Sequence, residues 1–231
     1  STLQQEASRK LGFTASRTMR VAQQLYEGME IGGDTAGLIT YMRTDSVNLA
    51  QDALDELRAF IPERYGKNAL PAEVPTYKTK AKNAQEAHEA IRPTSASLVP
   101  GKIKSSLNDD QFRLYELIWK RTLASQMTPA KMDTVAVEFD CGASASFRAN
   151  GSVITFPGFL AAYEVSKPEN ETKKERQLPD IQEGDVLDLD GIRSEQHFTE
   201  PPPRYSEASL VKAMEEYGIG RPSTYASIMS T

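Results

Sequence analysis

The sequence predicts an α+β fold, because helical and strand-like patterns occupy separate stretches of the chain. Up to about residue 127, apolar residues recur every three or four positions, as on the buried face of an amphipathic helix. Beyond Pro129 the pattern changes to alternation, which is typical of strands. We therefore expect a helical domain over residues 1–127, a β-rich domain over 128–200, and the start of a further helical region over 201–231.

Two short helices are expected at the beginning of the chain. Thr2 to Gln5 has the spacing of a capping box, and Gly12 is suited to end the helix that follows. A second helix is expected from about Ser16 to Gly28. Together they form a helix-turn-helix-like unit, a pattern that occurs in DNA-binding proteins and in purely structural bundles alike.

The next segment predicts a short strand and then a longer helix. Leu38–Arg43 follows a glycine-rich loop and is expected to be extended. Asn48, with Gln51 three residues later, predicts a helix start, and Pro62 predicts its end. The apolar residues of this helix would be Ala53, Leu54, Leu57, Phe60 and Ile61.

Two more helices complete the predicted helical domain. Asn83 is expected to cap a short helix that Pro93 ends. Asn108 and Gln111 have capping-box spacing and open the longest predicted helix. Its core-facing stripe would consist of Phe112, Tyr115, Ile118, Trp119 and Leu123.

The β-rich region is predicted from alternation and turn signals. Val135, Val137 and Phe139 alternate with polar residues. Asn150-Gly151 predicts a hairpin turn between strands at 145–148 and 153–156, and a further strand is expected at 186–189. The prolines at 201–203 mark a boundary, after which Ser206 would cap a helix that ends at Gly218.

Composition excludes several classes of protein. The 231 residues are 39% hydrophobic and 26% charged, which is enough apolar material for a core and excludes a disordered tail. One cysteine and two histidines argue against a disulfide scaffold and against a transition-metal site. No apolar run approaches the length of a membrane span, so we expect a soluble cytoplasmic protein. Because the chain opens at Ser1, we interpret it as a piece of a longer protein.

Charge is distributed unevenly along the chain. The net charge of −5 argues against a nucleic-acid-binding protein. However, residues 78–104 carry six basic groups against two acidic ones, whereas residues 164–200 carry eleven acidic groups against five basic ones. A site for a polyanion therefore remains possible in the first half.

Tyr41 and Arg43 form the pair whose chemistry is most informative. On a strand, side chains two residues apart share one face and lie about 7 Å apart. An arginine there could hold a phosphate in its planar fork, stabilising the transition state while the phenolic oxygen approaches phosphorus. Thr44 and Asp45 would add a donor and an acceptor. The alternative is a core tyrosine, an exposed arginine and a turn, and the spacing alone does not separate the two.

A second polar group is predicted on the 83–93 helix. Gln85, His88 and Arg92 have i, i+3, i+7 spacing, which places them on one helix face close to several lysines. The alternative is a solvated face with an ion pair between Glu89 and Arg92.

Three sequence blocks resemble signatures of the type IA DNA topoisomerases, in particular the bacterial ones. They are LITYMRTDS at 38–46, QEAHEAIRPT at 85–94 and GIGRPSTYASI at 218–228, in the order of that family. The opening residues 1–28 are similar as well. The resemblance implies a helical catalytic domain, part of a β-rich arch and the start of a helical region that binds single-stranded DNA, together forming part of a toroidal core.

The resemblance also implies a chemistry. Tyr41 would attack one DNA strand and form a 5′-phosphotyrosyl link, and resealing after strand passage would relax negative supercoils without ATP. Arg43 would hold the scissile phosphate. His88 would contact phosphate or belong to the active-site network, oriented by Asp45, and Thr44 and Arg92 are candidates for the same network.

The third block has its own physical logic. Pro222 suits the first turn of a helix, and Arg221, Ser223 and Thr224 would favour a phosphate there. An ordinary helix start is the alternative. Tyr225 is interpreted as a packing residue rather than a second nucleophile.

The chain differs from the family in what it lacks. No segment resembles the acidic, magnesium-binding Toprim domain with its Asp-x-Asp signature, nor the zinc-ribbon region. We therefore expect Mg²⁺ in the parent enzyme, no metal bound by this piece, and no DNA cleavage without the missing domain. Two other functions stay open, namely a non-enzymatic DNA-binding module built on the first helix pair, and a structural or interaction domain.

Overall fold

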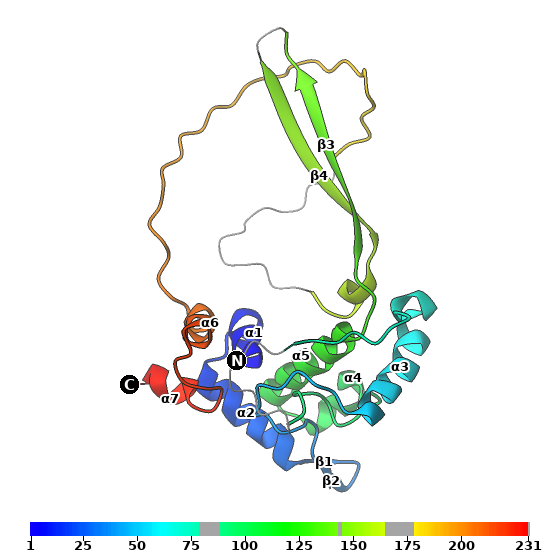
Figure 1. Ribbon diagram of the computed structural model, residues 1–231, viewed down its shortest axis with the longest axis vertical. Coiled ribbons are helices and arrows are strands. Elements are labelled where there is room, and N and C mark those ends of the chain that lie inside the picture. Colours follow the sequence, from blue (N-terminus) through cyan, green and yellow to red (C-terminus); the bar gives the residue numbers. More distant parts are fainter. Residues whose placement is uncertain (79–87, 143–144, 165–177, 231) are drawn as a thin grey trace. The chain divides into compact units, whose positions relative to one another are not determined.

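The computed structural model describes residues 1–78, 88–142, 145–164 and 178–230 (Figure 1). Its elements are α1 (Thr2–Leu11), α2 (Ala15–Glu27), β1 (Met29–Ile31), β2 (Asp34–Ala36), α3 (Gln51–Tyr65), η1 (Lys67–Ala69), α4 (Pro100–Ile103), η2 (Lys104–Ser106), α5 (Asp109–Ser125), β3 (Lys131–Asp140), β4 (Ser146–Phe156), η3 (Gly158–Ala161), α6 (Glu207–Tyr217) and α7 (Tyr225–Ser230). Apart from the short β1–β2 hairpin between α2 and α3, the described helices and strands lie in separate stretches, as in an α+β fold. None of the described helices has the length and apolarity needed to cross a bilayer.

The chain forms two compact units. The helical unit consists of residues 1–129, 157–166 and 205–231, and the hairpin unit consists of residues 130–156 and 167–204.

Helix α5 runs through the core of the helical unit. Four of the five residues in its predicted stripe are buried, and Phe112 is partly buried. The polar ends of the two large aromatic residues are satisfied, because the Tyr115 hydroxyl donates to the Leu98 carbonyl (2.7 Å) and Trp119 Nε1 donates to the Ala96 carbonyl (3.0 Å). The capping box at Asn108 and Gln111 is present, which confirms the predicted start.

The first two helices form as expected, apart from one cap. Gly12 ends α1 in the left-handed conformation (φ 68°), and the Thr14 hydroxyl caps α2 by accepting from the Arg17 N–H. The capping box at Thr2 was wrong, because α1 begins one residue earlier than that motif requires. Ser1 is the N-cap residue, and its side chain makes no capping hydrogen bond.

Both predicted ends of α3 were wrong. The helix starts after Ala50 rather than at Asn48, and Pro62 lies inside it. A proline removes one backbone hydrogen bond. The helix nevertheless continues for another turn to Tyr65, since Leu57 and Ile61 are anchored in the core before it and Gly66 ends it at φ 88°.

The short helix predicted over residues 83–93 is not present in its described part. Residues 83–87 lie outside the described residues, and 88–92 are irregular. Their backbone groups bond to other segments instead, because the Ala90 N–H donates to the Asn48 carbonyl and the Arg92 carbonyl accepts from the Thr40 N–H. A helix would need those groups for itself.

In the hairpin unit, β3 and β4 pair in antiparallel fashion along their whole length, visible as the long ribbon in Figure 1. The turn predicted at Asn150-Gly151 was wrong. These residues lie within β4, opposite Ala136 and Val135, and the connection falls at residues 141–145. A tight Asn-Gly turn needs positive φ at both positions, and Gly142 supplies a positive φ (73°) in the actual connection.

The strand predicted at 186–189 was also wrong. Residues 178–205 contain no helix or strand, and Val186 is 92% exposed. A strand is stable only when its backbone groups pair with a neighbour, and no described strand lies alongside this segment. The apolar residues Val186, Leu187 and Leu189 were therefore not sufficient to predict a strand.

Helices α6 and α7 pack against the first two helices, within the helical unit. Ser206 and Ser209 form a capping box, and Gly218 ends α6 at φ 70°, both as expected. Contacts to α1 and α2 include Ser1 Oγ to Glu215 (2.6 Å) and the Ala15 N–H to Glu207 Oε2 (2.7 Å). Helices α6 and α7, near the end of the chain, thus pack against its beginning.

Candidate active site around Tyr41

The segment that carries Tyr41 is irregular rather than a strand. Ile39 forms one isolated bridge with Pro93, and residues 40–50 contain no regular element. The prediction of a strand over Leu38–Arg43 was wrong because the partner chain around residues 88–94 is irregular as well. The two segments exchange a few hydrogen bonds, Thr94 N–H to the Leu38 carbonyl among them, and not a full ladder.

Side chains nevertheless alternate between inside and outside over residues 41–44. Met42 is 1% exposed and Thr44 is 8% exposed, whereas Tyr41 is 39% exposed and Arg43 is exposed as well. Met42 anchors the segment in the hydrophobic core. Both side chains of the predicted pair are therefore accessible to a ligand.

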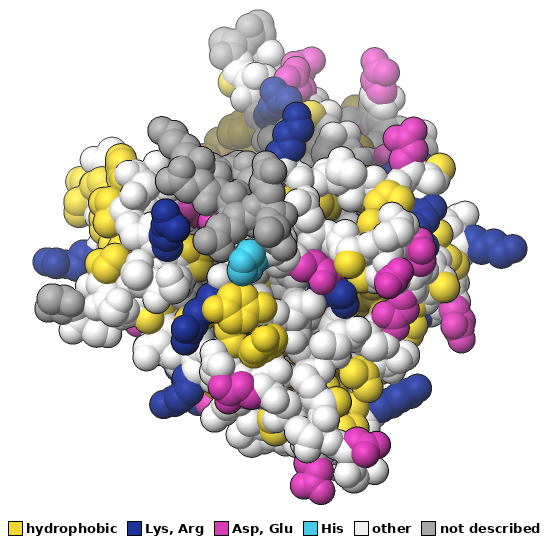
Figure 2. All heavy atoms as spheres, turned by 60° about the horizontal axis from the view of Figure 1, so that its bottom comes forward, with side chains coloured by type: hydrophobic (Ala, Val, Ile, Leu, Met, Phe, Trp, Pro, Cys, Tyr) yellow, Lys and Arg dark blue, Asp and Glu magenta, His cyan; other side chains and the backbone are white. Residues whose placement is uncertain are grey.

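Two aromatic rings contact the Tyr41 ring. Tyr26, at the end of α2, meets it edge to face with ring centroids 5.5 Å apart. His88 lies against it at 5.9 Å, with ring planes at 47°. Figure 2 shows a histidine side chain (cyan) on the surface directly beside a group of hydrophobic side chains (yellow, a colour that includes tyrosine). His88 is thus beside Tyr41, although its helix is missing, and Tyr26 is a neighbour that the sequence analysis overlooked.

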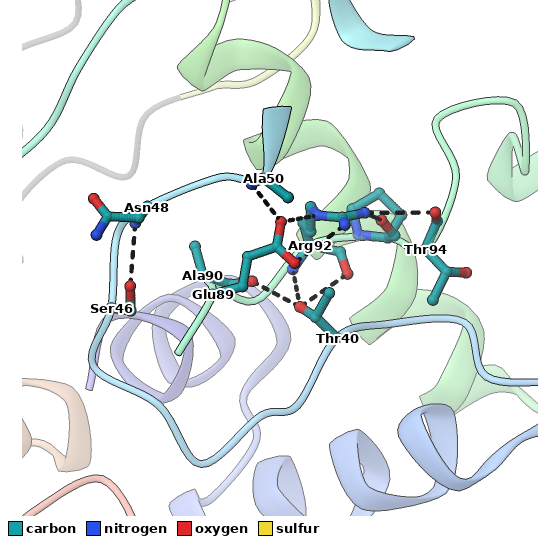
Figure 3. Close-up of polar contacts among 9 residues, drawn as sticks. Thr40, Ser46, Asn48, Ala50, Glu89, Ala90, Arg92 and Thr94 are labelled. Atoms are coloured by element: carbon teal, nitrogen blue, oxygen red, sulfur yellow. Dashed lines mark hydrogen bonds and ion pairs between the residues drawn. The ribbon is translucent and has the colours of Figure 1, made fainter. Parts of the chain in front are cut away.

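A partly buried arginine stabilises the loop beneath this site (Figure 3). The Arg92 guanidinium donates to both carboxylate oxygens of Glu89 (2.5 and 3.1 Å) and to the Pro93 carbonyl (2.9 Å). Its side chain is only 15% exposed. The Glu89–Arg92 pair, one of the two readings that the sequence left open, is therefore present, and an Arg92 contact with DNA stays a prediction.

Thr40 and Glu89 connect this loop to the Tyr41 segment (Figure 3). The Thr40 hydroxyl donates to the Ala90 carbonyl (2.7 Å) and accepts from the Arg92 N–H (2.9 Å). Glu89 Oε1 also accepts from the Ala50 N–H (2.8 Å), immediately before α3. Both ends of the Tyr41 segment are thus bonded to one short stretch. The sequence indicated the Glu89–Arg92 pair but not these bonds to the Tyr41 segment.

Thr44 and Asp45 both interact with neighbouring parts of the protein. The Thr44 hydroxyl is buried and accepts from the Ser46 N–H (3.0 Å), which makes a local turn. Burial most of all, and then Glu215 and Asp45, raise the pKa of the Tyr225 phenol. The Asp45 carboxylate is the smallest of these three causes, and its orientation of His88 stays a prediction.

The third sequence block forms a tight turn before α7. Arg221, Ser223 and Thr224 are exposed, and the Thr224 hydroxyl accepts from the Arg221 N–H (2.9 Å). Tyr225 is 3% exposed and packs with Val211 and Met214, which confirms its interpretation as a packing residue. A phosphate contact of the three exposed side chains stays a prediction.

Acidic residues do not gather into a metal site. In the described ranges, no three side chains of the types His, Cys, Asp and Glu lie close enough together to hold a metal ion. The chain does contain one Asp-x-Asp triplet, Asp188 to Asp190, contrary to the sequence analysis. It lies in the extended, exposed segment of the hairpin unit. The described residues therefore do not fit a magnesium ion.

Comparison with known proteins identifies the family. All 231 residues match the sequence model of the family described as DNA topoisomerase. "DNA topoisomerase 1" of Xylella fastidiosa (strain Temecula1) is 57% identical over 235 residues, and that of Rickettsia bellii is 54% identical over 231 residues; each alignment covers the whole chain. The chain therefore belongs to the DNA topoisomerase family.

A solved structure agrees in fold. Full-length topoisomerase I from Thermotoga maritima matches 99% of this chain with a TM-score of 0.76 and 38% sequence identity. The chain spans 36% of that protein and 29% of the length of the Xylella and Rickettsia bellii relatives. The resemblance inferred from the three blocks is thus confirmed at the level of the family.

Proposed function

We propose that, in the complete protein, Tyr41 is the nucleophile that cuts one DNA strand. Its phenolic oxygen would form a bond to the phosphorus of a phosphodiester while the bond from phosphorus to the 3′ oxygen breaks. The phenol loses its proton, and the 3′ oxygen leaves as a hydroxyl once it has gained one. The observation that carries this proposal is the accessibility of Tyr41 and Arg43 on either side of buried Met42.

Arg43 is the proposed phosphate ligand. Its guanidinium is exposed and makes no hydrogen bond or ion pair with the described residues, so its donors can bind the non-bridging oxygens. A guanidinium suits this role because its planar fork matches phosphate and keeps its charge at all working pH values. The charge that develops in the transition state would be stabilised there. His88, against the Tyr41 ring, would contact the same phosphate or orient the phenol.

Reversal of this step would reseal the strand. Because the phosphotyrosyl ester keeps the energy of the broken bond, attack by the 3′-hydroxyl restores the DNA without ATP. Passage of the other strand through the gap before resealing would relax negative supercoils. The proposed substrate is therefore single-stranded or negatively supercoiled DNA in the cytoplasm, with Arg221, Ser223 and Thr224 as further contacts.

Magnesium is proposed for the parent protein alone. The ligands would come from the Toprim domain that the family resemblance implies, since the described residues of this chain offer no such group. That domain would be the partner of the Tyr41 site. No step above depends on a metal bound by this chain.

The test is covalent trapping of DNA by the complete protein. With a single-stranded oligonucleotide labelled on the 3′ side of the cut, Tyr41→Phe should abolish the denaturant-resistant protein–DNA adduct and leave oligonucleotide binding unchanged. Tyr77→Phe, which removes an exposed hydroxyl bonded to the Ser125 carbonyl, is the matched control and should trap DNA normally. Adduct formation by the Tyr41 variant would overturn the proposal.

The isolated chain provides a second test. Incubated with negatively supercoiled plasmid and magnesium, the 231-residue chain should leave the topoisomer distribution unchanged. Relaxation by this chain alone would show that the proposed Toprim partner is not needed. Absence of any salt-sensitive oligonucleotide binding, by chain and parent alike, would instead favour a structural role.

A further inference from the structure

Tyr26 has a geometric relation to the proposed nucleophile that its sequence position did not suggest. Its ring and the Tyr41 ring lie 5.5 Å apart with their planes at 68°. Edge-to-face packing of this kind is a preferred arrangement, because the positive edge of one ring meets the negative face of the other. The contact restricts the angles that the Tyr41 ring can adopt.

The backbone brings these two rings together in a defined way. After α2 the β1–β2 hairpin turns the chain back, and the Leu38 N–H donates to the Leu25 carbonyl (2.8 Å). A Cβ atom on Gly37 would lie 2.8 Å from the Tyr26 carbonyl oxygen, closer than a real Cβ atom approaches another atom. Residue 37 must therefore be glycine for the Tyr41 segment to lie against the end of α2.

Core packing does not account for Tyr26. Its side chain is 40% exposed, and its hydroxyl makes no hydrogen bond with the described residues. Leu25, the residue before it, is fully buried and supplies the core contact of this helical turn. The exposed ring of Tyr26 has Tyr41 as its aromatic neighbour in the described structure.

We propose that Tyr26 is a positioning residue that sets the ring angle of Tyr41 for attack on the phosphate. The inference rests on the proposed function of Tyr41. A phenol whose ring is free to turn spends less time with its oxygen in line with the bond to be broken, and poor alignment of reacting groups lowers the rate of a positioned reaction. Loss of one aromatic pair corresponds to about a two- to tenfold change in the favoured population.

The experiment uses the complete protein and a saturating single-stranded oligonucleotide. We expect Tyr26→Ala to lower the initial rate of adduct formation by about two- to tenfold, with an unchanged Kd for the oligonucleotide and an unchanged Tm. Tyr26→Phe keeps the ring and should restore the rate of the unmodified protein. Tyr205→Ala removes another exposed tyrosine and should have no effect.

Gly37→Ala tests the same inference without removing a ring. The added methyl group would push the Tyr26 carbonyl away, so this variant should also form adduct more slowly at an unchanged Kd. If Tyr26→Ala fails to fold, Tyr26→Leu replaces it, with a reduced rate expected. An unmodified rate in the folded Tyr26 variant, a phenylalanine variant as slow as the alanine one, or a slower rate explained entirely by a weaker Kd would each overturn the inference.

Failure of this inference can be told apart from failure of the proposed function. Tyr41→Phe must give no adduct if the proposed function holds. If it gives none while Tyr26→Ala reacts at the unmodified rate, the positioning role is wrong and the nucleophile stands. If Tyr41→Phe still gives adduct, the proposed function itself is wrong.

Discussion

The helical unit and the hairpin unit both contain apolar side chains but bury them to different extents. In the helical unit, residues such as Leu114 and Ile61 are completely buried among several helices. In the hairpin unit, Val135 is 52% exposed and Phe147 is 48% exposed, since two strands alone provide no second layer. An apolar pattern therefore predicts burial only where other elements can cover it.

The largest expected effect comes from the helical core. Leu114→Ala should lower the free energy of unfolding of the 231-residue chain by about 2–5 kcal/mol, because a large cavity would form at a fully buried site. Val135→Ala in the hairpin should change it by less than about 0.5 kcal/mol. Urea unfolding followed by far-UV circular dichroism, which reports on helices and strands alike, measures both, and equal losses would contradict the comparison.

An ion pair in the helical unit should contribute more to the free energy of unfolding than an ion pair in the hairpin unit. Glu89→Gln should cost about 1–3 kcal/mol, because Arg92 is largely buried and would lose a charged partner. Glu138→Gln in the hairpin should have no measurable effect, since its partner Arg148 is 3.9 Å away and both side chains are well exposed. A neutral result for Glu89→Gln would show that the loop beneath Tyr41 does not depend on this pair.

Two of the asparagines that served as sequence signals, Asn108 and Asn150, offer a finer test. Asn108→Ala should cost about 1 kcal/mol, because it removes the cap of α5. Asn150→Ala should cost less, since Asn150 is exposed within β4 and forms no turn. A greater loss at Asn150, measured by thermal unfolding, would indicate that the Asn-Gly turn exists after all.

The last expected effect is a change in pH dependence confined to alkaline pH, and it comes from Tyr163. Burial, followed by its hydrogen bond to Glu6, raises the pKa of Tyr163 to about 12. An unfolded tyrosine titrates near about 10, so between these values the unfolded chain releases a proton that the folded chain keeps. Stability therefore falls as pH rises through this range.

Replacing Tyr163 should reveal that contribution. Tyr163→Phe should flatten the decrease in unfolding free energy between about pH 10 and pH 12, and leave the pH dependence near neutrality unchanged. Chemical unfolding at a series of pH values measures it. If the unfolding free energy of the variant still falls as steeply between these pH values, the pKa of Tyr163 is not raised in the folded protein. Tyr115, whose pKa is also raised by burial, would then account for the fall in stability.

The candidate site was predictable as a set of residues but not as a geometry. Tyr41, Arg43 and His88 were found from their blocks, and the structure places His88 against Tyr41. The strand and the helix assigned to them were wrong, because their backbone groups bond across segments that lie about 50 residues apart in the sequence. The contact of Tyr26 with Tyr41 gave no sequence signal, since it depends on the path of the intervening hairpin.

The sequence by itself determined the local elements whose signals lie within a few residues. Gly12 and Gly218 end their helices and the Asn108 box begins α5, because a cap is satisfied by its own neighbours. Only the tertiary structure decided whether 186–189 became a strand and whether Pro62 ended a helix. The pairing of a strand and the continuation of a helix past a proline depend on free energy from distant partners, and the local pattern does not specify those partners.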